Sequence, residues 1–254
     1  MQDGDGCKSM GTKMRLDKYL ADMSVGTRTE VKQMIKKGLV VVNEQVEKKP
    51  EQKVDQHDKI VVSGTEVSYI QYEYLMLNKP AGVVSATEDN VHKTVLDCIE
   101  SKRNDLFPVG RLDIDTEGLL LLTNDGELAH KLLSPKKHVP KTYYAKIQGM
   151  VTEYEVEQFK QGLDLGDFIA KPAKLIIKKA GIVEADTCYS EIEVTICEGK
   201  FHQVKRMFEA VGMKVVFLKR ISMGNLLLDP RLNVGEFRPL TEEERRMIGA
   251  SIDR

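Results

Sequence analysis

The chain has 254 residues, enough for one large domain or two to three small ones, and its formal net charge is −1. Hydrophobic residues make up 41% of it and charged residues 30%, which is typical of a globular protein with a substantial core. No apolar run is long enough to cross a bilayer, and the polar opening lacks the pattern of a secretory signal. The charge excludes a chain that binds polyanions over its whole surface, so any nucleic-acid contact requires a local basic patch.

The four cysteines lie far apart without a C-x-x-C pair, and the five histidines are scattered. This spacing predicts no metal site, and it favours a reduced, cytoplasmic compartment. We expect residues 1–13 to be a disordered leader.

Residues 14–63 have the pattern of a small α/β module. Leu16, Tyr19, Leu20 and Met23 form one apolar helix face, and a second helix is expected from Thr27, which has capping-box spacing to Glu30. Its buried face is predicted to contain Val31, Met34 and Ile35, with Gly38 as its end. Short strands are expected at 39–42 and 59–62, with a turn at Asn43 and Glu44.

The outer face of this second helix is basic. Residues 13–37 contain seven Lys or Arg against three acids. A solvated helix face is the ordinary explanation, but like charges on successive turns repel each other unless an anion compensates. We therefore predict RNA contacts for Arg15, Arg28, Lys32, Lys36 and Lys37.

Residues 64–73 show no helical period and are predicted to be a linker, followed by one domain over residues 74–254. A short apolar strand is expected from Tyr74 to a Pro/Gly turn, and a helix candidate runs from Thr94 to Ile99.

The most informative segment is residues 107–126, FPVGRLDIDTEGLLLLTNDG. A loop with one arginine and three acids precedes four leucines, which predict a strand buried on both faces. The turn at 124–126 then leads into a helix with Leu128, Leu132 and Leu133 inward. Turn and cap roles would explain single Asp or Thr residues, but an arginine two residues from Asp113 at a buried strand suggests a carboxylate held ionised.

From residue 141 onward, the pattern predicts a strand, a helix (153–161), further strands, a helix (202–211) and a last strand. This order predicts a ferredoxin-like half over about residues 141–229. The tail, PLTEEERRMIGA, is expected to be a short capped helix. The fold class is α+β: a small RNA-binding module, then a mixed, mainly antiparallel central sheet flanked by helices.

The run at residues 15–46 resembles the S4 RNA-binding domain, which implies binding of structured RNA without implying an enzyme. Further on, GRLDIDTEGLLLLTNDG (110–126) is similar to the signature of the RsuA/RluB branch of pseudouridine synthases. NKPAG (78–82), KTYYAKI (141–147) and EGKFHQVKRMFEAVG (198–212) extend this resemblance to nearly all of residues 14–245. The resemblance implies isomerisation of uridine to pseudouridine in ribosomal RNA, without a cofactor.

By this resemblance, Asp113 is the catalytic nucleophile. A carboxylate could attack or deprotonate the ribose, or add to the pyrimidine ring, and the sequence does not choose. The target base must leave the stack, which implies base flipping. Tyr143 matches the tyrosine that stacks on the target base, although periodicity alone would make it a core aromatic.

Lys205 is the third candidate catalytic residue, at the flank of an apolar helix face where it can pair with Asp113. Many relatives carry arginine at this position. The lysine of this chain keeps the positive charge but cannot make the bidentate contact of a guanidinium group. Arg206 lies nearly opposite and is expected to meet solvent or phosphate. His202 is expected to cap its helix or contact phosphate, and Arg111 to orient RNA or the loop. Leu226 and Leu227 are candidates for the pocket wall or for the core, and the core is the more common role for such leucines.

Within the branch, Phe201-His202-Gln203 resembles the small-subunit enzymes more than the large-subunit ones. We therefore expect 16S rRNA, or a small-subunit assembly intermediate, as the substrate, and a monomer without membrane or nucleotide partners. The alternatives are a 23S rRNA synthase and a non-catalytic S4-type ribosome assembly factor. An enzyme that acts on another polyanion, such as a nucleotide-dependent one, ranks last because no P-loop is present.

Overall fold

The structure is a computed structural model that describes residues 13–101 and 103–250, and these fall into two compact units. The N-terminal unit extends to Gln71 and includes Ser101–Asp105, and the catalytic unit comprises Tyr72–Glu100 and the chain from Leu106 onward. Apart from Lys13, the leader expected at residues 1–13 lies outside the described residues. Among the helices that the structure describes, none has the length and apolar character needed to cross a bilayer.

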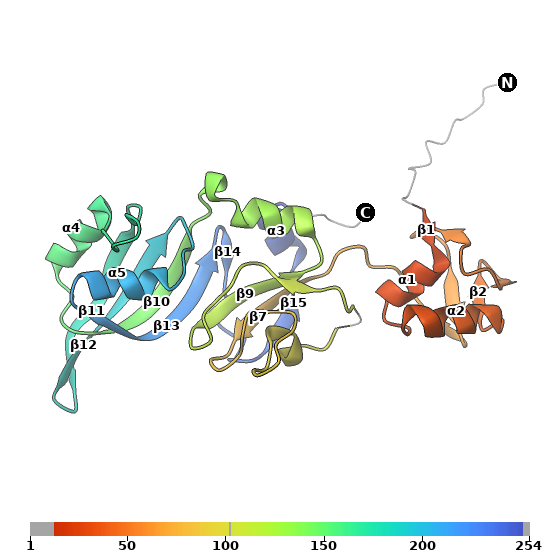
Figure 1. Cartoon of the computed structure of the whole chain (residues 1–254), viewed down its shortest axis with the longest axis horizontal. Helices are drawn as coiled ribbons and strands as arrows, with labels where there is room; N and C mark the ends of the chain where they lie inside the picture. The colour runs from red at the N-terminus through yellow and green to blue at the C-terminus, as the bar shows by residue number, and fades with distance from the viewer. Residues whose placement is uncertain (1–12, 102, 251–254) are drawn as a thin grey trace, which may run out of the picture. The chain divides into compact units, whose positions relative to one another are not determined.

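The N-terminal unit packs two helices against short strands (Figure 1). Its elements are β1 (Met14–Arg15), α1 (Leu16–Asp22), α2 (Arg28–Lys36), β2 (Val40–Val42), β3 (Gln45–Glu47), β4 (Lys53–Val54), β5 (Ile60–Val62) and β6 (Thr65–Glu66). The strands form a sheet in the order β3-β2-β5-β6 and a separate β1-β4 pair. The S4 resemblance thus corresponds to a real helix-and-sheet module.

The predicted helix signals of this unit are confirmed. Thr27 accepts a hydrogen bond from the Glu30 backbone while the Glu30 carboxylate accepts from the Thr27 backbone, so the capping box is complete. Val31 and Ile35 are fully buried, whereas Met34 is half-buried. The turn after β2 is also confirmed.

The segment expected to be a linker, residues 64–73, is largely part of the N-terminal unit. It contains β6, and the Tyr19 hydroxyl donates a hydrogen bond to the Val67 carbonyl at 2.9 Å. The Tyr69 ring lies 4.9 Å from the Tyr19 ring. The sequence concealed this packing because the segment has neither a helical nor a strand period.

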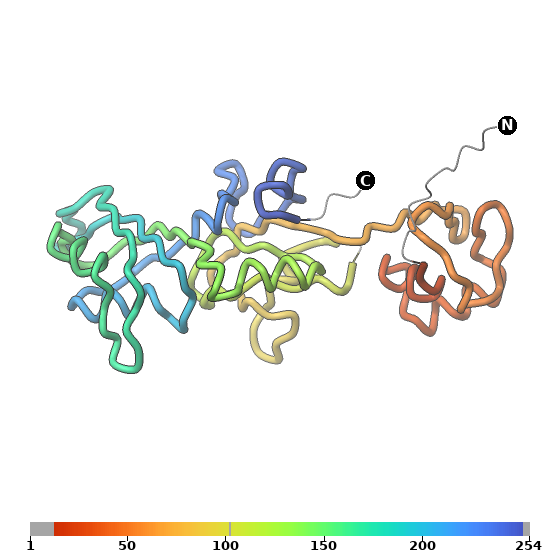
Figure 2. Tube along the Cα trace, turned by 90° about the horizontal axis from the view of Figure 1, so that it is seen from above, coloured from red at the N-terminus to blue at the C-terminus, as the bar shows by residue number. Residues whose placement is uncertain are grey.

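The catalytic unit is built on a nine-stranded mixed sheet. Its elements are β7 (Tyr74–Lys79), η1 (Val95–Cys98), β8 (Phe107–Pro108), β9 (Glu117–Thr123), α3 (Gly126–Leu133), η2 (Pro135–Lys137), β10 (Lys141–Gln148), α4 (Glu153–Gln161), β11 (Lys174–Glu184), β12 (Thr187–Ile196), α5 (Gln203–Ala210), β13 (Lys214–Met223), β14 (Leu226–Leu227), β15 (Phe237–Pro239) and α6 (Glu242–Ile248). The connection from β7 to β8 leaves the sheet as a loop and carries η1, a 3₁₀ turn where a helix was expected (Figure 2).

The main path of the sheet is β11-β12-β10-β13-β9-β7-β15, and the β13–β9 pair is parallel. The half formed by β10, α4, β11, β12, α5 and β13 has the spatial order β13-β10-β12-β11 with antiparallel neighbours. This is a βαββαβ arrangement of the ferredoxin-like type.

The central strands are buried on both faces, as the run of leucines predicted. Leu120 and Leu122 of β9 belong to the core beneath α4 and α5, whereas Leu119 and Leu121 belong to the core beneath α3. One expectation was wrong: Leu133, at the end of α3, is 42% exposed rather than buried.

Candidate active site

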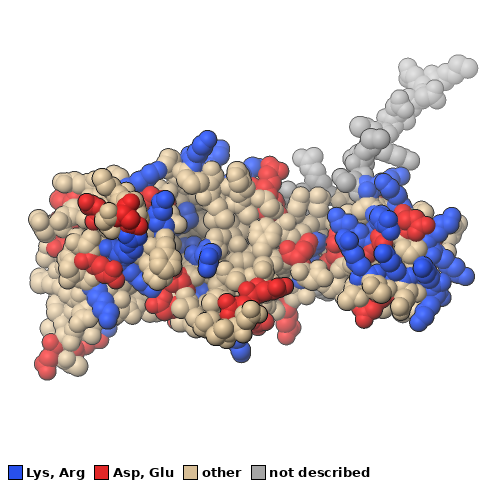
Figure 3. Space-filling model, viewed as in Figure 1, with Lys and Arg blue, Asp and Glu red and all other residues tan. Residues whose placement is uncertain are grey.

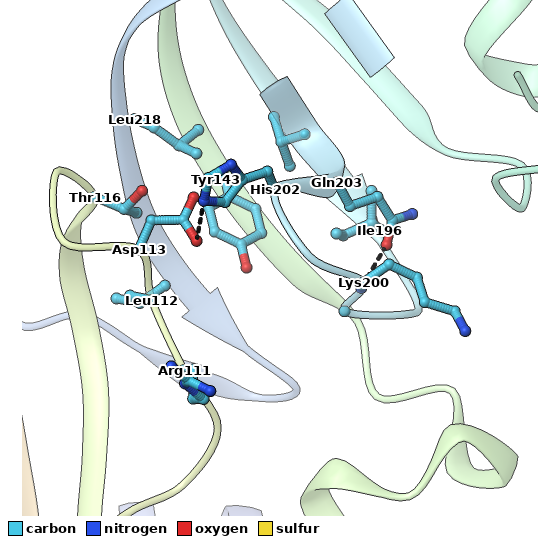
Figure 4. Close-up of a pocket in the computed structure, with 12 residues that line it drawn as sticks. Arg111, Leu112, Asp113, Thr116, Tyr143, Ile196, Lys200, His202, Gln203 and Leu218 are labelled. Carbon is cyan, nitrogen blue, oxygen red and sulfur yellow. Dashed lines mark hydrogen bonds and ion pairs between the residues drawn. The ribbon is translucent and has the colours of Figure 1, made fainter. Parts of the chain in front are cut away.

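A small cavity of about 60 Å³ lies where the loop before β9 meets the start of α5 and the strands β10 and β13. Figure 4 shows Asp113, His202 and Tyr143 side by side in it. The lining residues are Arg111, Leu112, Asp113, Thr116, Tyr143, Ile196, Gly199, Lys200, His202, Gln203, Val204 and Leu218. Segments far apart in the sequence thus meet at Asp113.

Gly118 brings the Asp113 loop against β13. It has φ +103°, and a Cβ there would lie 2.2 Å from the Arg220 carbonyl oxygen. Only glycine allows this backbone approach, through which Gly118 pairs with Arg220 in the parallel β9–β13 register. The second glycine of the signature is therefore a structural requirement of the site.

Lys79 also holds the loop that carries Asp113. Its side chain is fully buried, and Nζ donates hydrogen bonds to the carbonyls of Asp113 (3.1 Å), Thr116 (2.9 Å) and Pro80 (3.0 Å). Burial lowers the pKa of Lys79 to about 8. This lysine fixes the backbone from which the Asp113 carboxylate projects.

Lys205 forms ion pairs with two acids, Asp113 and Asp115. Lys205 Nζ lies 3.3 Å from Asp113 Oδ2, so the predicted pair is present, but it lies closer to Asp115 Oδ1, at 2.6 Å. Burial alone would lower the pKa of Lys205, but the hydrogen bond with Asp115 and the charge of Asp113 outweigh burial and raise it. Lys205 is therefore firmly protonated and partly neutralises both carboxylates.

His202 precedes α5 in a left-handed conformation, with φ +49°. Its side chain makes no capping hydrogen bond, and Nε2 lies 3.6 Å from Asp113 Oδ1. The Phe201 ring stacks on the imidazole at 3.7 Å and is 77% exposed. The pair places an aromatic face at the rim of the cavity.

Tyr143 lies on the inward face of β10, together with Ala145 and Ile147, as the alternation predicted. It is 8% exposed, belongs to the core cluster and also lines the cavity. Tyr143 is therefore a core aromatic that also lines the cavity, and its stacking on a target base stays a prediction.

The two arginines of the catalytic unit that were expected to contact RNA differ in their surroundings. Arg111 is exposed and lines the cavity. Arg206 is paired with Asp167 and donates to the Leu165 carbonyl at 2.8 Å. An RNA phosphate would have to compete with Asp167 for Arg206.

Leu226 and Leu227 were expected in the pocket wall or in the core. They form β14, which pairs with Met223 and Ser222 at the end of β13, and neither lines the cavity that holds Asp113. Leu226 is fully buried in the core beneath α3, whereas Leu227 is 67% exposed.

Figure 3 shows a group of basic side chains on the face of the N-terminal unit that carries α1 and α2. Arg28, Lys32, Lys36 and Lys37 are exposed. Arg15 donates two hydrogen bonds to the buried Asp17, whose pKa falls because of them. Arg15 therefore carries a partly compensated charge, and Lys32 Nζ lies 3.9 Å from the same carboxylate.

Three residues of the site were not predicted from the sequence. Asp115 competes for Lys205, Lys79 holds the loop, and the hydroxyl of the buried Thr116 lines the cavity without a hydrogen-bond partner among the described residues. The signal available for Lys79 was its position at the end of the mainly apolar strand β7, because a charge buried there requires acceptors.

Comparison with known proteins agrees with this geometry. The model of the RNA pseudouridylate synthase family matches residues 73–210, and the model of the S4 domain matches residues 14–60. An uncharacterised RNA pseudouridine synthase of Bacillus subtilis is 48% identical over 92% of this chain and 98% of its own length.

Two further relatives are named after different ribosomal subunits. Ribosomal small subunit pseudouridine synthase A of Vibrio cholerae is 41% identical over 91% of this chain and 97% of its own length. Ribosomal large subunit pseudouridine synthase B of Bacillus subtilis is 39% identical over 94% of this chain and 97% of its own. A crystal structure of a pseudouridylate synthase, 36% identical, superposes with a TM-score of 0.61 over 92% of this chain and 99% of that chain. The chain therefore belongs to the RNA pseudouridine synthases, as an S4-containing enzyme of the RsuA/RluB type.

Proposed function

We propose that this synthase isomerises a uridine of 16S rRNA, with Asp113 as its nucleophile. The position of Asp113 carries the proposal: its carboxylate lies in a polar cavity, 3.3 Å from Lys205 and beside Tyr143, on a loop held by Lys79. Lys205 Nζ is close enough to balance the negative charge that a carboxylate carries when it acts as a nucleophile or base.

The reaction breaks the N1–C1′ bond of uridine, rotates the base and joins C5 to C1′. C5 then loses its proton and N1 gains one, so the product is an isomer. Asp113 can attack or deprotonate the ribose or add to the ring, and each route needs the carboxylate within reach of the flipped nucleotide. Tyr143 would then stack against the base, and Lys205 would balance the charge of Asp113.

The rim and the N-terminal unit would hold the RNA. Phe201 offers an exposed ring of the kind on which unpaired bases stack. His202, Arg111 and the α2 lysines supply positive or polar groups for phosphates. The 16S substrate is favoured by the Phe201-His202-Gln203 sequence, while the relatives named for each subunit, at 41% and 39% identity, keep 23S rRNA as the alternative.

The test is tritium release from [5-³H]uridine-labelled RNA. Wild-type enzyme is incubated with 16S and 23S transcripts and with partly assembled subunits of each kind. Release from 16S rRNA or its assembly intermediate alone is the expected result, and release from 23S alone would overturn the substrate assignment while retaining the chemistry.

A further inference from the structure

A second cavity adjoins the one that holds Asp113, within the catalytic unit. It has a volume of about 280 Å³ and shares Arg111, Tyr143, Gly199 and Lys200 with the first. Its remaining cations are Lys141, Lys171 and Arg220, and Glu198 is the acid in its wall. Five basic side chains thus surround one carboxylate.

Two of these cations are buried. Arg220 is 2% exposed and Lys141 is 8% exposed. Arg220 lies directly across from Tyr143 in the β10–β13 register, and Lys141 lies two residues before Tyr143 on the same face of β10. The sheet therefore places both cations beside the tyrosine that is proposed to contact the target base.

Neither buried cation has a counter-charge in the part of the chain that the structure describes. Lys141 Nζ donates to the Val139 carbonyl at 3.0 Å, and Arg220 Nε donates to the Leu119 carbonyl at 2.7 Å. Arg220 Nη2 is buried and has no hydrogen-bond partner among the described residues. Burial, reinforced by the charge of Arg220, lowers the pKa of Lys141, as expected for a cation without an anion.

The acid of the cavity does not relieve this imbalance. Glu198 Oε1 accepts hydrogen bonds from the Gln203 side chain at 2.7 Å and from the Lys171 backbone at 2.8 Å. Two buried, uncompensated cations are costly, and the cost is offset when an anion with several acceptor oxygens binds.

We propose that this cavity is a phosphate subsite in which Lys141 and Arg220 hold a phosphate of the RNA strand next to the target uridine. The proposal rests on the proposed function, because it takes RNA as the ligand. A phosphate group fits the guanidinium fork and the ammonium, and a bound phosphate would fix the register of the strand while Asp113 reaches the neighbouring nucleotide. Lys141 and Arg220 are thus positioning residues rather than catalytic ones.

Cys197 provides a direct readout, because it lines this cavity and is partly exposed. Alkylation by iodoacetamide is followed peptide by peptide in the full chain, with Cys188, at the other end of β12, as the internal control. RNA at ten times its dissociation constant should slow alkylation of Cys197 about tenfold by mass action and leave Cys188 unchanged. Millimolar inorganic phosphate should protect Cys197 weakly.

Lys141→Met supplies the second measurement, and Lys178→Met, which removes an exposed lysine of β11, is its matched control. Lys141→Met should weaken RNA binding roughly tenfold and reduce the slope of log affinity against log salt by about 1. Lys178→Met should change neither. Arg220→Lys keeps the charge and the fold but loses the fork, so it should weaken binding less than Lys141→Met.

The outcomes separate the two proposals. Unprotected Cys197 with normal tritium release would overturn the subsite alone, as would equal salt slopes for Lys141→Met and Lys178→Met. Protection by inorganic phosphate but not by RNA would also overturn it, since the site would then serve a free anion. Protection of Cys197 by RNA without tritium release from any substrate would support the subsite while the proposed 16S function fails.

Discussion

The two units of this enzyme carry their positive charges in opposite ways. On α2 of the N-terminal unit, Lys32 and Lys36 are exposed, and Lys32 Nζ lies 3.9 Å from Asp17 Oδ2. In the catalytic unit, Lys79 and Arg220 are fully or almost fully buried, and Lys205 is only 18% exposed. Exposed charges attract RNA through a field that salt screens, and one such charge can substitute for another. Buried charges hold particular groups in place, so one buried charge cannot substitute for another.

Replacing a buried charge should therefore have the larger effect. Lys79→Met removes the donor that holds the Asp113 loop, so tritium release should fall about 100-fold, the cost of a misplacement near 1 Å. RNA binding measured by filter retention should stay near the wild-type value, and Lys178→Met should leave both unchanged. Full activity of Lys79→Met would show that the loop holds its shape without this lysine.

Lys79 also predicts a pH dependence of stability. Its pKa is about 8 in the folded chain and 10.5 as its ordinary value, so the unfolded chain binds more protons between these pH values. The stability that Lys79 contributes is lost as the pH falls through 8 and is fully present above 10.5. The free energy of unfolding of wild type minus that of Lys79→Met, from urea titrations, should therefore rise from pH 8 to pH 10.5. A flat difference would contradict the buried charge.

The exposed charges should behave additively and depend on salt. Lys32→Ala with Lys36→Ala should weaken RNA binding roughly tenfold near 0.1 M salt and flatten the salt slope by about 2. Turnover at saturating RNA should not change. Lys48→Ala with Lys49→Ala removes two other exposed lysines of the unit, and an equal loss from this pair would mean that charge number, rather than the α2 face, decides binding.

The smallest expected effect concerns the cap of α2. Thr27→Ala removes the side-chain acceptor for the Glu30 backbone and should destabilise the N-terminal unit by about 1 kcal/mol. Thr29→Ala, within the same helix, is the control. The measurement is hydrogen exchange of the α2 amides, and equal exchange in the two variants would argue against the capping box as the source of stability.

Local patterns were sufficient for much of the fold. The capping box at Thr27, the capped helix expected in the tail, the alternation along β10 and the leucine run of β9 all correspond to the observed elements. These features depend on residues a few positions apart, so the sequence displays them directly. Leu227 and Leu133 were misjudged because the end of an element is exposed whenever nothing packs over it.

The site was predictable only in part. The motif led to Asp113, Tyr143 and Lys205, which the fold does bring together around one cavity or ion pair. The competition of Asp115 for Lys205 and the carbonyl acceptors of Lys79 depend on the path of the backbone, which no spacing encodes. The uncompensated charges of Lys141 and Arg220 likewise emerge only when strands distant in sequence pair.

The central claim is that Asp113 carries the chemistry, and Asp113→Asn tests it most directly. The substitution keeps the size of the side chain and removes its charge, so tritium release should fall roughly 10⁴-fold or more while RNA binding is retained. Tritium release within about tenfold of wild type, in a variant with unchanged RNA affinity and melting temperature, would contradict the account.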